Sequence, residues 1–267
     1  MRTGFAGARS QGGTLMEHNT FFRRAAALVL TLVFAAAAAL QGLAVYPMPI
    51  QTASETEAVY LFNADTGKTL LTQNADQPRY VASLTKMMTA LLLLESGKDL
   101  NGEVTVPTDL TQEFKDIQNA NGTTMGLRIG ETVRRIDLLN ALLITSANDA
   151  ASVIAWDVGG SLNAFIQQMN ARAAELGCTS ATFTCAHGLY DYGNVASAED
   201  MAKIAAACAA NETFAQVAGS TTYTLGQTNF HSEQRTISSS NPLMDASGAY
   251  YKDSVKWVKG GFTTLAG

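Results

Sequence analysis

The chain has 267 residues, of which 47% are hydrophobic and 15% are charged, and its formal net charge is −5. This is the composition of a globular protein, with enough length for one large domain or two small ones. The mild acidity, without a basic stripe interleaved with aromatic residues, excludes nucleic acid as a partner.

The first fifty residues have the pattern of an export segment. Arg23 and Arg24 precede an apolar run from Ala25 to Val45, and small residues follow where a signal peptidase could cut. The run of about 21 residues is also long enough to span a bilayer, so residues 1–50 are predicted to be a signal peptide or an N-terminal membrane anchor. Residues 1–15 resemble an upstream extension. Both interpretations predict an exported, extracytoplasmic protein that contacts the cytoplasmic membrane.

A polar linker over residues 51–57 leads into one predicted domain over residues 58–267. In chain order, the expected elements are a hairpin at 58–72, a helix at 84–94, loops and short strands over 99–132, helices at 136–145, 148–158, 162–176 and 198–209, and strands at 221–225, 235–239 and 255–263. Ser161 and Ser197 are the expected N-caps of the last two helices. Strands at both ends with helices between them predict an α+β fold, with an antiparallel sheet packed against a helical cluster.

Ser83 and Lys86 stand three residues apart at the predicted start of the first helix, so their side chains share one face. A serine needs an adjacent base to become a nucleophile, and a lysine can serve if burial keeps it neutral. The segment from Leu84 to Leu94 is apolar on nearly every side, which predicts a buried helix. Lys86 is therefore predicted to be a neutral amine that activates Ser83.

The chain contains three cysteines, Cys178, Cys185 and Cys208. Export permits a disulfide between Cys178 and Cys185, but the odd count argues against a structural need for one. Cys208 lies in an alanine-rich helix and is expected to be a buried small hydrophobe. A metal site built from Cys178, Cys185 and His187 lacks a familiar ligand spacing, so none is predicted. His187 is expected to be a structural loop residue.

Two further short motifs follow the Ser83-x-x-Lys86 pair: Ser146-Ala147-Asn148 and Lys259-Gly260-Gly261. In this order the three motifs resemble the S-x-x-K, S-x-N and K-T-G set of penicillin-binding proteins and serine β-lactamases. Together with His187-Gly188-Leu189 and the residues around each motif, they resemble the low-molecular-weight D-alanyl-D-alanine carboxypeptidases. The resemblance runs from about residue 57 to the end of the chain.

The resemblance implies a hydrolase that removes the terminal D-alanine from peptidoglycan stem peptides through an acyl-enzyme on Ser83, and that β-lactams inhibit covalently. Lys86 would be the base, and Ser146 would relay a proton to the leaving amine. The implied substrate-binding residues are Asn148, Lys259, Gly260, Gly261, Phe262 and Thr263. Asn148 would bind the amide backbone of the substrate or orient Lys86. Lys259 would hold the substrate carboxylate, and the N–H groups of Ser83 and Phe262 would form the oxyanion hole. No cofactor or metal is implied, and a monomer is expected.

The sequence departs from the family pattern at three places. Gly260 stands where the family usually has threonine or serine, which predicts weaker substrate binding with the same chemistry. Cys185 stands where asparagine is common. The fold implied by the resemblance also has two more strands after the third motif, and the sequence stops at Gly267 before them. We therefore expect a β-lactamase/transpeptidase-like catalytic domain that is incomplete at its C-terminal end and folds poorly when expressed alone.

Two other functions remain open from the sequence. A serine β-lactamase shares the acylation machinery, but a class A enzyme needs a glutamate that activates water for deacylation. Glu175 is the only acidic residue between Ser161 and Tyr190, and its surroundings do not match that pattern. The other alternative is an exported, non-catalytic peptidoglycan-binding homologue, which the departure at Gly260 would suit.

Overall fold

The computed structural model describes residues 54–189 and 193–266, so the predictions for residues 1–50 lie outside the described residues. The described chain begins with a hairpin of β1 (Val59–Phe62) and β2 (Thr69–Gln73), which pair antiparallel. The turn between them closes with a 2.8 Å hydrogen bond from the Gly67 N–H to the Asn63 carbonyl, and Gly67 has a φ of 66°. The hairpin predicted for residues 58–72 is confirmed.

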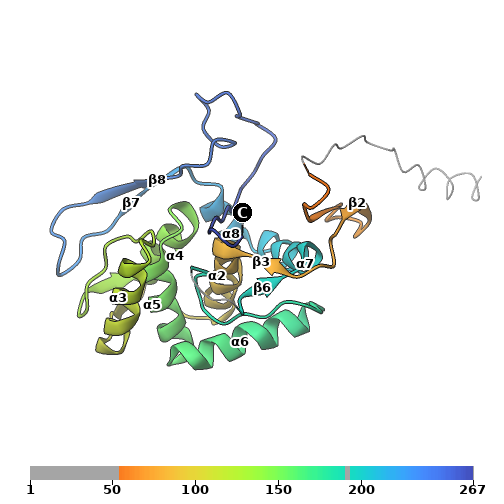
Figure 1. Cartoon of the computed structure of the whole chain (residues 1–267). Helices are drawn as coiled ribbons and strands as arrows, with labels where there is room; N and C mark the ends of the chain where they lie inside the picture. The colour runs from red at the N-terminus through yellow and green to blue at the C-terminus, as the bar shows by residue number, and fades with distance from the viewer. Residues whose placement is uncertain (1–53, 190–192, 267) are drawn as a thin grey trace, which may run out of the picture. The chain divides into compact units, whose positions relative to one another are not determined.

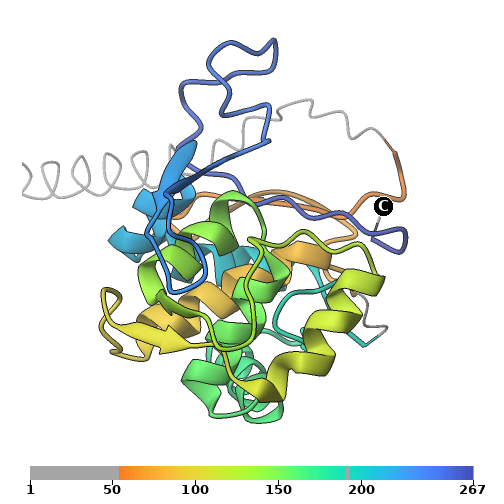
Figure 2. The same ribbon diagram turned by 90° about the vertical axis from the view of Figure 1, so that its left-hand side faces the viewer.

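A cluster of helices forms the core, and Figures 1 and 2 show α2 running through its middle. The helices are η1 (Ala82–Thr85), α2 (Lys86–Glu95), η2 (Thr108–Leu110), α3 (Thr111–Asn119), α4 (Arg135–Ile144), α5 (Asn148–Gly159), α6 (Leu162–Glu175), α7 (Ala198–Ala209) and α8 (Glu212–Ala218). Because α2 is apolar on nearly all sides, it can contact α4, α5, α6, α7 and α8 at once.

The predicted helices and their caps are confirmed. The Ser161 side chain accepts a hydrogen bond from the Ala164 N–H at the start of α6, and Ser197 accepts one from the Asp200 N–H at the start of α7. Each cap satisfies one of the N–H groups that a helix start leaves without an intrahelical partner. The predicted helices at 136–145 and 148–158 correspond to α4 and α5.

The sequence patterns missed α3 and α8. The interpretation of residues 99–132 as loops and short strands is wrong at α3, which occupies Thr111–Asn119. Most residues of α3 are polar, and Ile117 is its one fully buried side chain, so the apolar periodicity that reveals a helix is weak. α8 has seven residues, and its Asn211 cap accepts a hydrogen bond from the Phe214 N–H.

The remaining strands are β3 (Arg79–Tyr80), β4 (Glu103–Thr105), β5 (Thr132–Arg134), β6 (Val195–Ala196), β7 (Thr222–Leu225) and β8 (Arg235–Ser238). Among the described residues, all strand pairs are antiparallel, and they form four two-stranded sheets: β1–β2, β3–β6, β4–β5 and β7–β8. The α+β class is confirmed, as are the strands predicted at 221–225 and 235–239. In Figure 1 the β7–β8 hairpin lies beside α4, which it contacts.

The strand predicted at 255–263 is absent from the described chain. These residues run as irregular backbone without ladder hydrogen bonds, although they carry the Lys259-Gly260-Gly261 motif. Two consecutive glycines weaken a strand, and no described strand pairs with this segment to compensate. Within residues 54–189 and 193–266, none of the helices is both long and apolar enough to cross a membrane.

Candidate active site

The nucleophile candidate lies at the junction between η1 and α2. Ser83 belongs to η1, and α2 begins at Lys86, so one turn of helix brings the Ser83 Oγ and the Lys86 Nζ to 2.9 Å. Ala82, the residue before Ser83, has a φ of 44°, a left-handed conformation that costs a non-glycine residue about 1 kcal/mol or more. This strained turn is braced by Gly188, where an added Cβ would collide with the Ala82 carbonyl.

Lys86 is fully buried, and its amine makes three hydrogen bonds. Its Nζ donates to the Asn148 Oδ1 at 2.8 Å and to the His187 carbonyl at 2.8 Å, in addition to its contact with Ser83. Burial lowers the pKa of Lys86 well below its usual value, and the nearby charge of Lys259 lowers it further. The nearby Cys185 and Asp149 oppose this shift without overcoming it.

The hydrogen-bond geometry is compatible with the neutral amine that the lowered pKa favours. A neutral amine has two N–H groups and one lone pair, and the oxygens of Asn148 and His187 can only accept. These two oxygens therefore use both N–H groups of the neutral Lys86, and the lone pair is left to face the Ser83 hydroxyl. This is the arrangement of a base that takes the proton of a serine.

Asn148, the first residue of α5, holds Lys86 on one side and the cleft wall on the other. Its Oδ1 accepts from Lys86, while its Nδ2 donates to the Thr123 carbonyl at 2.9 Å. The backbone N–H of Asn148 also donates to the Thr123 carbonyl, at 2.8 Å. The sequence left open whether Asn148 binds substrate or orients Lys86, and its side-chain contacts favour the second role.

Ser146 and Lys259 form a second polar pair. The Lys259 Nζ donates to the Ser146 Oγ at 3.0 Å and to the Gly260 carbonyl at 2.6 Å. Burial lowers the pKa of Lys259 to about 8, so the group is largely charged at neutral pH. Ser146 has a φ of 60°, a conformation that L-residues seldom adopt and that here directs the hydroxyl into the cleft.

The glycine-rich third motif packs against the start of the nucleophile's helix. A Cβ added at Gly261 would lie 2.8 Å from the Ser83 backbone nitrogen, so only glycine allows this approach. Gly260 has open space around it. Phe262 is 77% exposed, and it lines the cleft together with Thr263. The motif therefore lies beside Ser83 even though the backbone there is not a strand.

Ser83 lies between two adjoining cavities of about 440 and 410 Å³. The two cavities share Ser83, Thr123, Ser146 and Phe262, and the second also contacts Lys259. Together they form a cleft that exposes the nucleophile to both sides. All the site residues predicted from the sequence lie within or directly behind this cleft.

Asp149 is a site residue for which the sequence analysis gave no role. Its buried carboxylate accepts hydrogen bonds of 3.0 Å from the N–H groups of Met125, Gly126 and Leu127, which belong to the segment that continues from the cleft wall. Burial raises the pKa of Asp149, and these backbone N–H groups oppose the rise. In the sequence, the only sign of this role is an acidic residue at the start of a buried helix. Acidic residues are common at helix starts because they stabilise the positive end of the helix dipole, so this sign is not specific.

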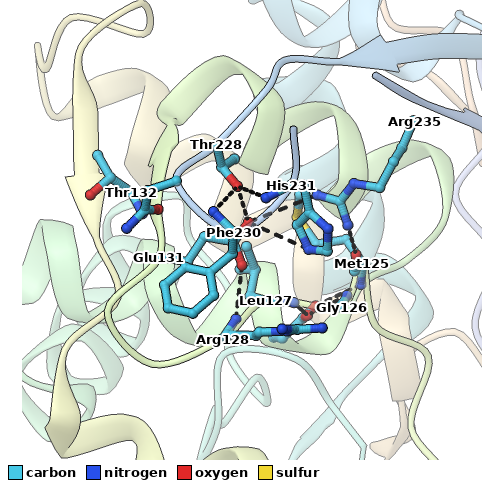
Figure 3. Close-up of polar contacts among 12 residues, drawn as sticks. Met125, Gly126, Leu127, Arg128, Glu131, Thr132, Thr228, Phe230, His231 and Arg235 are labelled. Carbon is cyan, nitrogen blue, oxygen red and sulfur yellow. Dashed lines mark hydrogen bonds and ion pairs between the residues drawn. The ribbon is translucent and has the colours of Figure 1, made fainter. Parts of the chain in front are cut away.

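The outer side of the same segment is anchored by the β7–β8 hairpin (Figure 3). The Arg235 Nη1 donates to the Met125 carbonyl at 2.8 Å. The fully buried Glu131 accepts from the Arg128 N–H at 3.0 Å and from the Thr228 hydroxyl at 2.8 Å, and Figure 3 shows these contacts around His231. Asp149 and the hairpin thus hold the 125–131 loop from two sides.

His187 lies next to Lys86. The His187 Nε2 is 2.8 Å from the Glu113 Oε1, and the His187 carbonyl is an acceptor for Lys86, so this loop histidine supports the site through its backbone. Cys178, Cys185 and Cys208 are free thiols. Among residues 54–189 and 193–266, no group of three or more His, Cys, Asp or Glu side chains is placed to hold a metal ion.

Comparison with known proteins gives consistent matches. The D-alanyl-D-alanine carboxypeptidase DacF of Bacillus subtilis is 32% identical over 155 residues, which cover 58% of this chain and 39% of that protein. The D-alanyl-D-alanine endopeptidase of Escherichia coli is 28% identical over 222 residues, which cover 81% of this chain and 67% of that protein. The match to DacF therefore spans well under half of the relative's length.

A solved structure supports the same relationship. The DD-transpeptidase of Streptomyces K15 superposes with a TM-score of 0.69 at 29% identity, covering 78% of this chain and 81% of that chain. This likeness confirms the transpeptidase-like α+β fold expected from the sequence. Residues 47–267 match the family profile described as "Peptidase_S11: D-alanyl-D-alanine carboxypeptidase". The chain therefore belongs to the S11 peptidase family of D-alanyl-D-alanine carboxypeptidases.

Proposed function

We propose that this protein is a serine DD-carboxypeptidase that removes the terminal D-alanine from peptidoglycan stem peptides. The observation that carries the proposal is the contact between Ser83 and a buried Lys86 whose two N–H groups are occupied by oxygen acceptors. In the first step, the Ser83 Oγ attacks the carbonyl carbon of the D-Ala-D-Ala bond while Lys86 takes the hydroxyl proton. The N–H groups of Ser83 and Phe262 hold the oxyanion that forms.

The second polar pair would complete the acylation step. The Ser146 hydroxyl, bonded to Lys259, gives its proton to the leaving nitrogen and regains one from the protonated Lys86, so that free D-alanine departs, the acyl group stays on Ser83 and Lys86 is neutral again. The charged Lys259 attracts the C-terminal carboxylate of the substrate. Water then attacks the acyl-enzyme with Lys86 as base, and Ser83 regains its proton.

Acylation by penicillin provides the direct test. We expect the full chain to form a covalent adduct with a fluorescent penicillin, and we expect Ser83→Ala to form none. Such an adduct would contradict the sequence-based expectation that the chain folds poorly when expressed alone. Because a non-catalytic peptidoglycan-binding protein would give no covalent band, an unlabelled wild-type chain that binds peptidoglycan normally would support that alternative and refute the proposal. The adduct should release slowly, whereas rapid turnover of penicillin would instead favour a β-lactamase.

The position of Glu175 argues against a β-lactamase. Glu175 ends α6, pairs with Arg172 at 3.1 Å, and lines a cavity that Ser83 does not reach. It cannot activate a water for an acyl group on Ser83 from there. The described cleft offers no carboxylate among its lining residues for that role.

The relatives include both carboxypeptidases and endopeptidases, and the charge in the cleft helps to choose between these two activities. We favour the carboxypeptidase because Lys259 places a positive charge where a free C-terminal carboxylate would bind. Incubation with a pentapeptide stem and with a cross-linked dimer, followed by chromatography, separates the two activities. Release of D-alanine from the pentapeptide supports the proposal, and cleavage of the dimer alone would refute it.

The proposed site of action is outside the cytoplasm. The basic pair Arg23 and Arg24 followed by the apolar run supports export, with contact to the cytoplasmic membrane through the N-terminal segment. We propose, as the sequence led us to expect, that the protein acts as a monomer without a cofactor. Fractionation of cells expressing the full chain tests the location.

A further inference from the structure

A second cluster of reactive side chains lies next to Lys86 and lines a cavity other than the cleft. Glu113, Cys185 and His187 line a separate cavity of about 200 Å³ between α3 and α6. None of the residues that line this cavity lines either of the cleft cavities. The cluster therefore has its own access route and takes no part in the mechanism above.

The three side chains form a thiol–imidazole–carboxylate series. The His187 Nε2 lies 2.8 Å from the Glu113 Oε1, and the same oxygen accepts from the Ser152 hydroxyl at 3.0 Å. The Cys185 thiol is hydrogen-bonded to the His187 side chain, and its Sγ accepts from the Gly188 N–H at 3.2 Å. A carboxylate that orients an imidazole beside a thiol is the arrangement that activates cysteine nucleophiles.

The neighbours of Cys185 favour its thiolate. Burial alone would raise the pKa of Cys185, but the hydrogen bond and charge of His187, together with the Gly188 N–H, outweigh it and lower the pKa. Around the other two cysteines, burial is the dominant influence. Burial raises the pKa of Cys178 to about 11 and raises that of Cys208 still further. Cys178 and Cys208, whose thiols have raised pKa values, can therefore serve as comparison cysteines within the same chain.

The segment that carries Cys185 also positions the base. The His187 carbonyl accepts from the Lys86 Nζ, and the Ala186 carbonyl accepts from the Thr89 hydroxyl of α2 at 2.6 Å. Gly188 packs directly against the Ala82 carbonyl. A group added to the Cys185 sulfur would displace this segment, whose carbonyl groups accept from Lys86 and Thr89.

We propose that Cys185 is a redox-modification site, reached through the 200 Å³ cavity by small peroxides, and that its oxidation slows acylation of Ser83. The Cys185 sulfur attacks one peroxide oxygen, so that an S–O bond forms and the O–O bond breaks. The sulfur is oxidised to a sulfenic acid, and the peroxide is reduced. His187 holds the thiol proton and passes it to the leaving oxygen, which departs as water or an alcohol.

The test uses the full chain treated with hydrogen peroxide in the presence of dimedone, which traps sulfenic acids. Peptide mass mapping should find the adduct on Cys185 at least about ten times more often than on Cys178. Peroxide without dimedone should slow penicillin acylation of Ser83 by about tenfold or more. A thiol reductant should restore the rate, which it would not do if methionine oxidation were the cause.

Matched variants isolate the thiol. Cys178→Ser/Cys208→Ala retains Cys185 and should keep the full response, whereas Cys185→Ser should acylate at a rate that peroxide no longer changes. Equal trapping on Cys178 and Cys185, or unchanged acylation after complete modification of Cys185, would overturn the proposal. If untreated protein fails to acylate, the function proposed above is wrong, and the dimedone pattern still decides whether Cys185 is the reactive thiol.

Discussion

Replacing Asp149 with asparagine should test how the cleft wall is held. The Asp149 Oδ1 accepts from the N–H groups of Met125 and Ala150, and its Oδ2 accepts from those of Gly126 and Leu127. Asparagine keeps one acceptor oxygen and places an NH₂ group where the other stood. That NH₂ group would face two N–H donors, so both would lose their acceptor.

The expected loss of stability follows from those two hydrogen bonds. Asp149 is 2% exposed, so water cannot replace the missing acceptor. A buried donor left without a partner costs about 1–3 kcal/mol, so Asp149→Asn should lower the free energy of unfolding by about 2–6 kcal/mol. Urea denaturation followed by circular dichroism measures this difference, provided that the slope of the transition is unchanged.

A matched control exists in Asp200, which is also fully buried and accepts from the N–H groups of Thr179 and Ser180 at 3.0 and 2.8 Å. Asp200→Asn should cost a similar free energy, but its partners do not line the cleft. Asp149 holds the segment that begins at Thr123, to which Asn148 is bonded twice. Only Asp149→Asn should therefore slow penicillin acylation, by about tenfold or more.

Acylation must be compared under conditions in which both variants remain folded, as judged by their own denaturation curves. If both variants acylate at the wild-type rate, the segment does not position Asn148 and the reasoning fails. Equal slowing in both variants would show that the effect comes from general loss of stability.

Three further predictions concern the third motif. Because burial lowers the pKa of Lys259 to about 8, its charge is lost as pH rises through 8, and KM for a carboxylate-ended peptide should rise about tenfold per pH unit above that point. Lys259→Arg stays charged, so its KM should not change with pH over this range. A wild-type KM that does not depend on pH would contradict the assignment. Gly261→Ala places a Cβ 2.8 Å from the Ser83 nitrogen and should slow acylation about a hundredfold. Gly260→Ala meets open space and should slow acylation much less. Similar acylation rates for the two variants in a stopped-flow comparison would refute the close approach. Gly260→Thr should lower KM for the peptide with little change in kcat, and unchanged steady-state kinetics would show that the missing hydroxyl is unimportant.

The sequence predicted most of the helical scaffold because its signals are local. Ser161 and Ser197 cap the helices that they were expected to cap, and the apolar stretch after Ser83 forms the buried centre of the cluster. The pairing of Ser83 with Lys86 follows from helix geometry alone. These features require only neighbours within a few positions in the chain.

Other features depend on contacts between distant segments, which a single sequence does not reveal. The backbone around Lys259 is not a strand, because a strand requires a hydrogen-bonding partner that no pattern within residues 255–263 can supply. The polar α3 contributes Glu113 to the environment of His187, 74 positions away. Asp149 is visible in the sequence, but its three loop N–H partners become apparent only in the folded chain.

The hydrogen bonds around the Lys86 amine also imply how low pH would inactivate Ser83. Protonation gives the amine a third hydrogen, and with Asn148 and His187 already served, that hydrogen can point only at the Ser83 oxygen. The protonated amine has no lone pair left to take the Ser83 proton, and its third N–H engages one of the two lone pairs of the Ser83 oxygen. The 2.9 Å contact between Lys86 and Ser83 therefore makes activity depend on the protonation state of the amine: Ser83 is activated when Lys86 is neutral and inactive when Lys86 is charged.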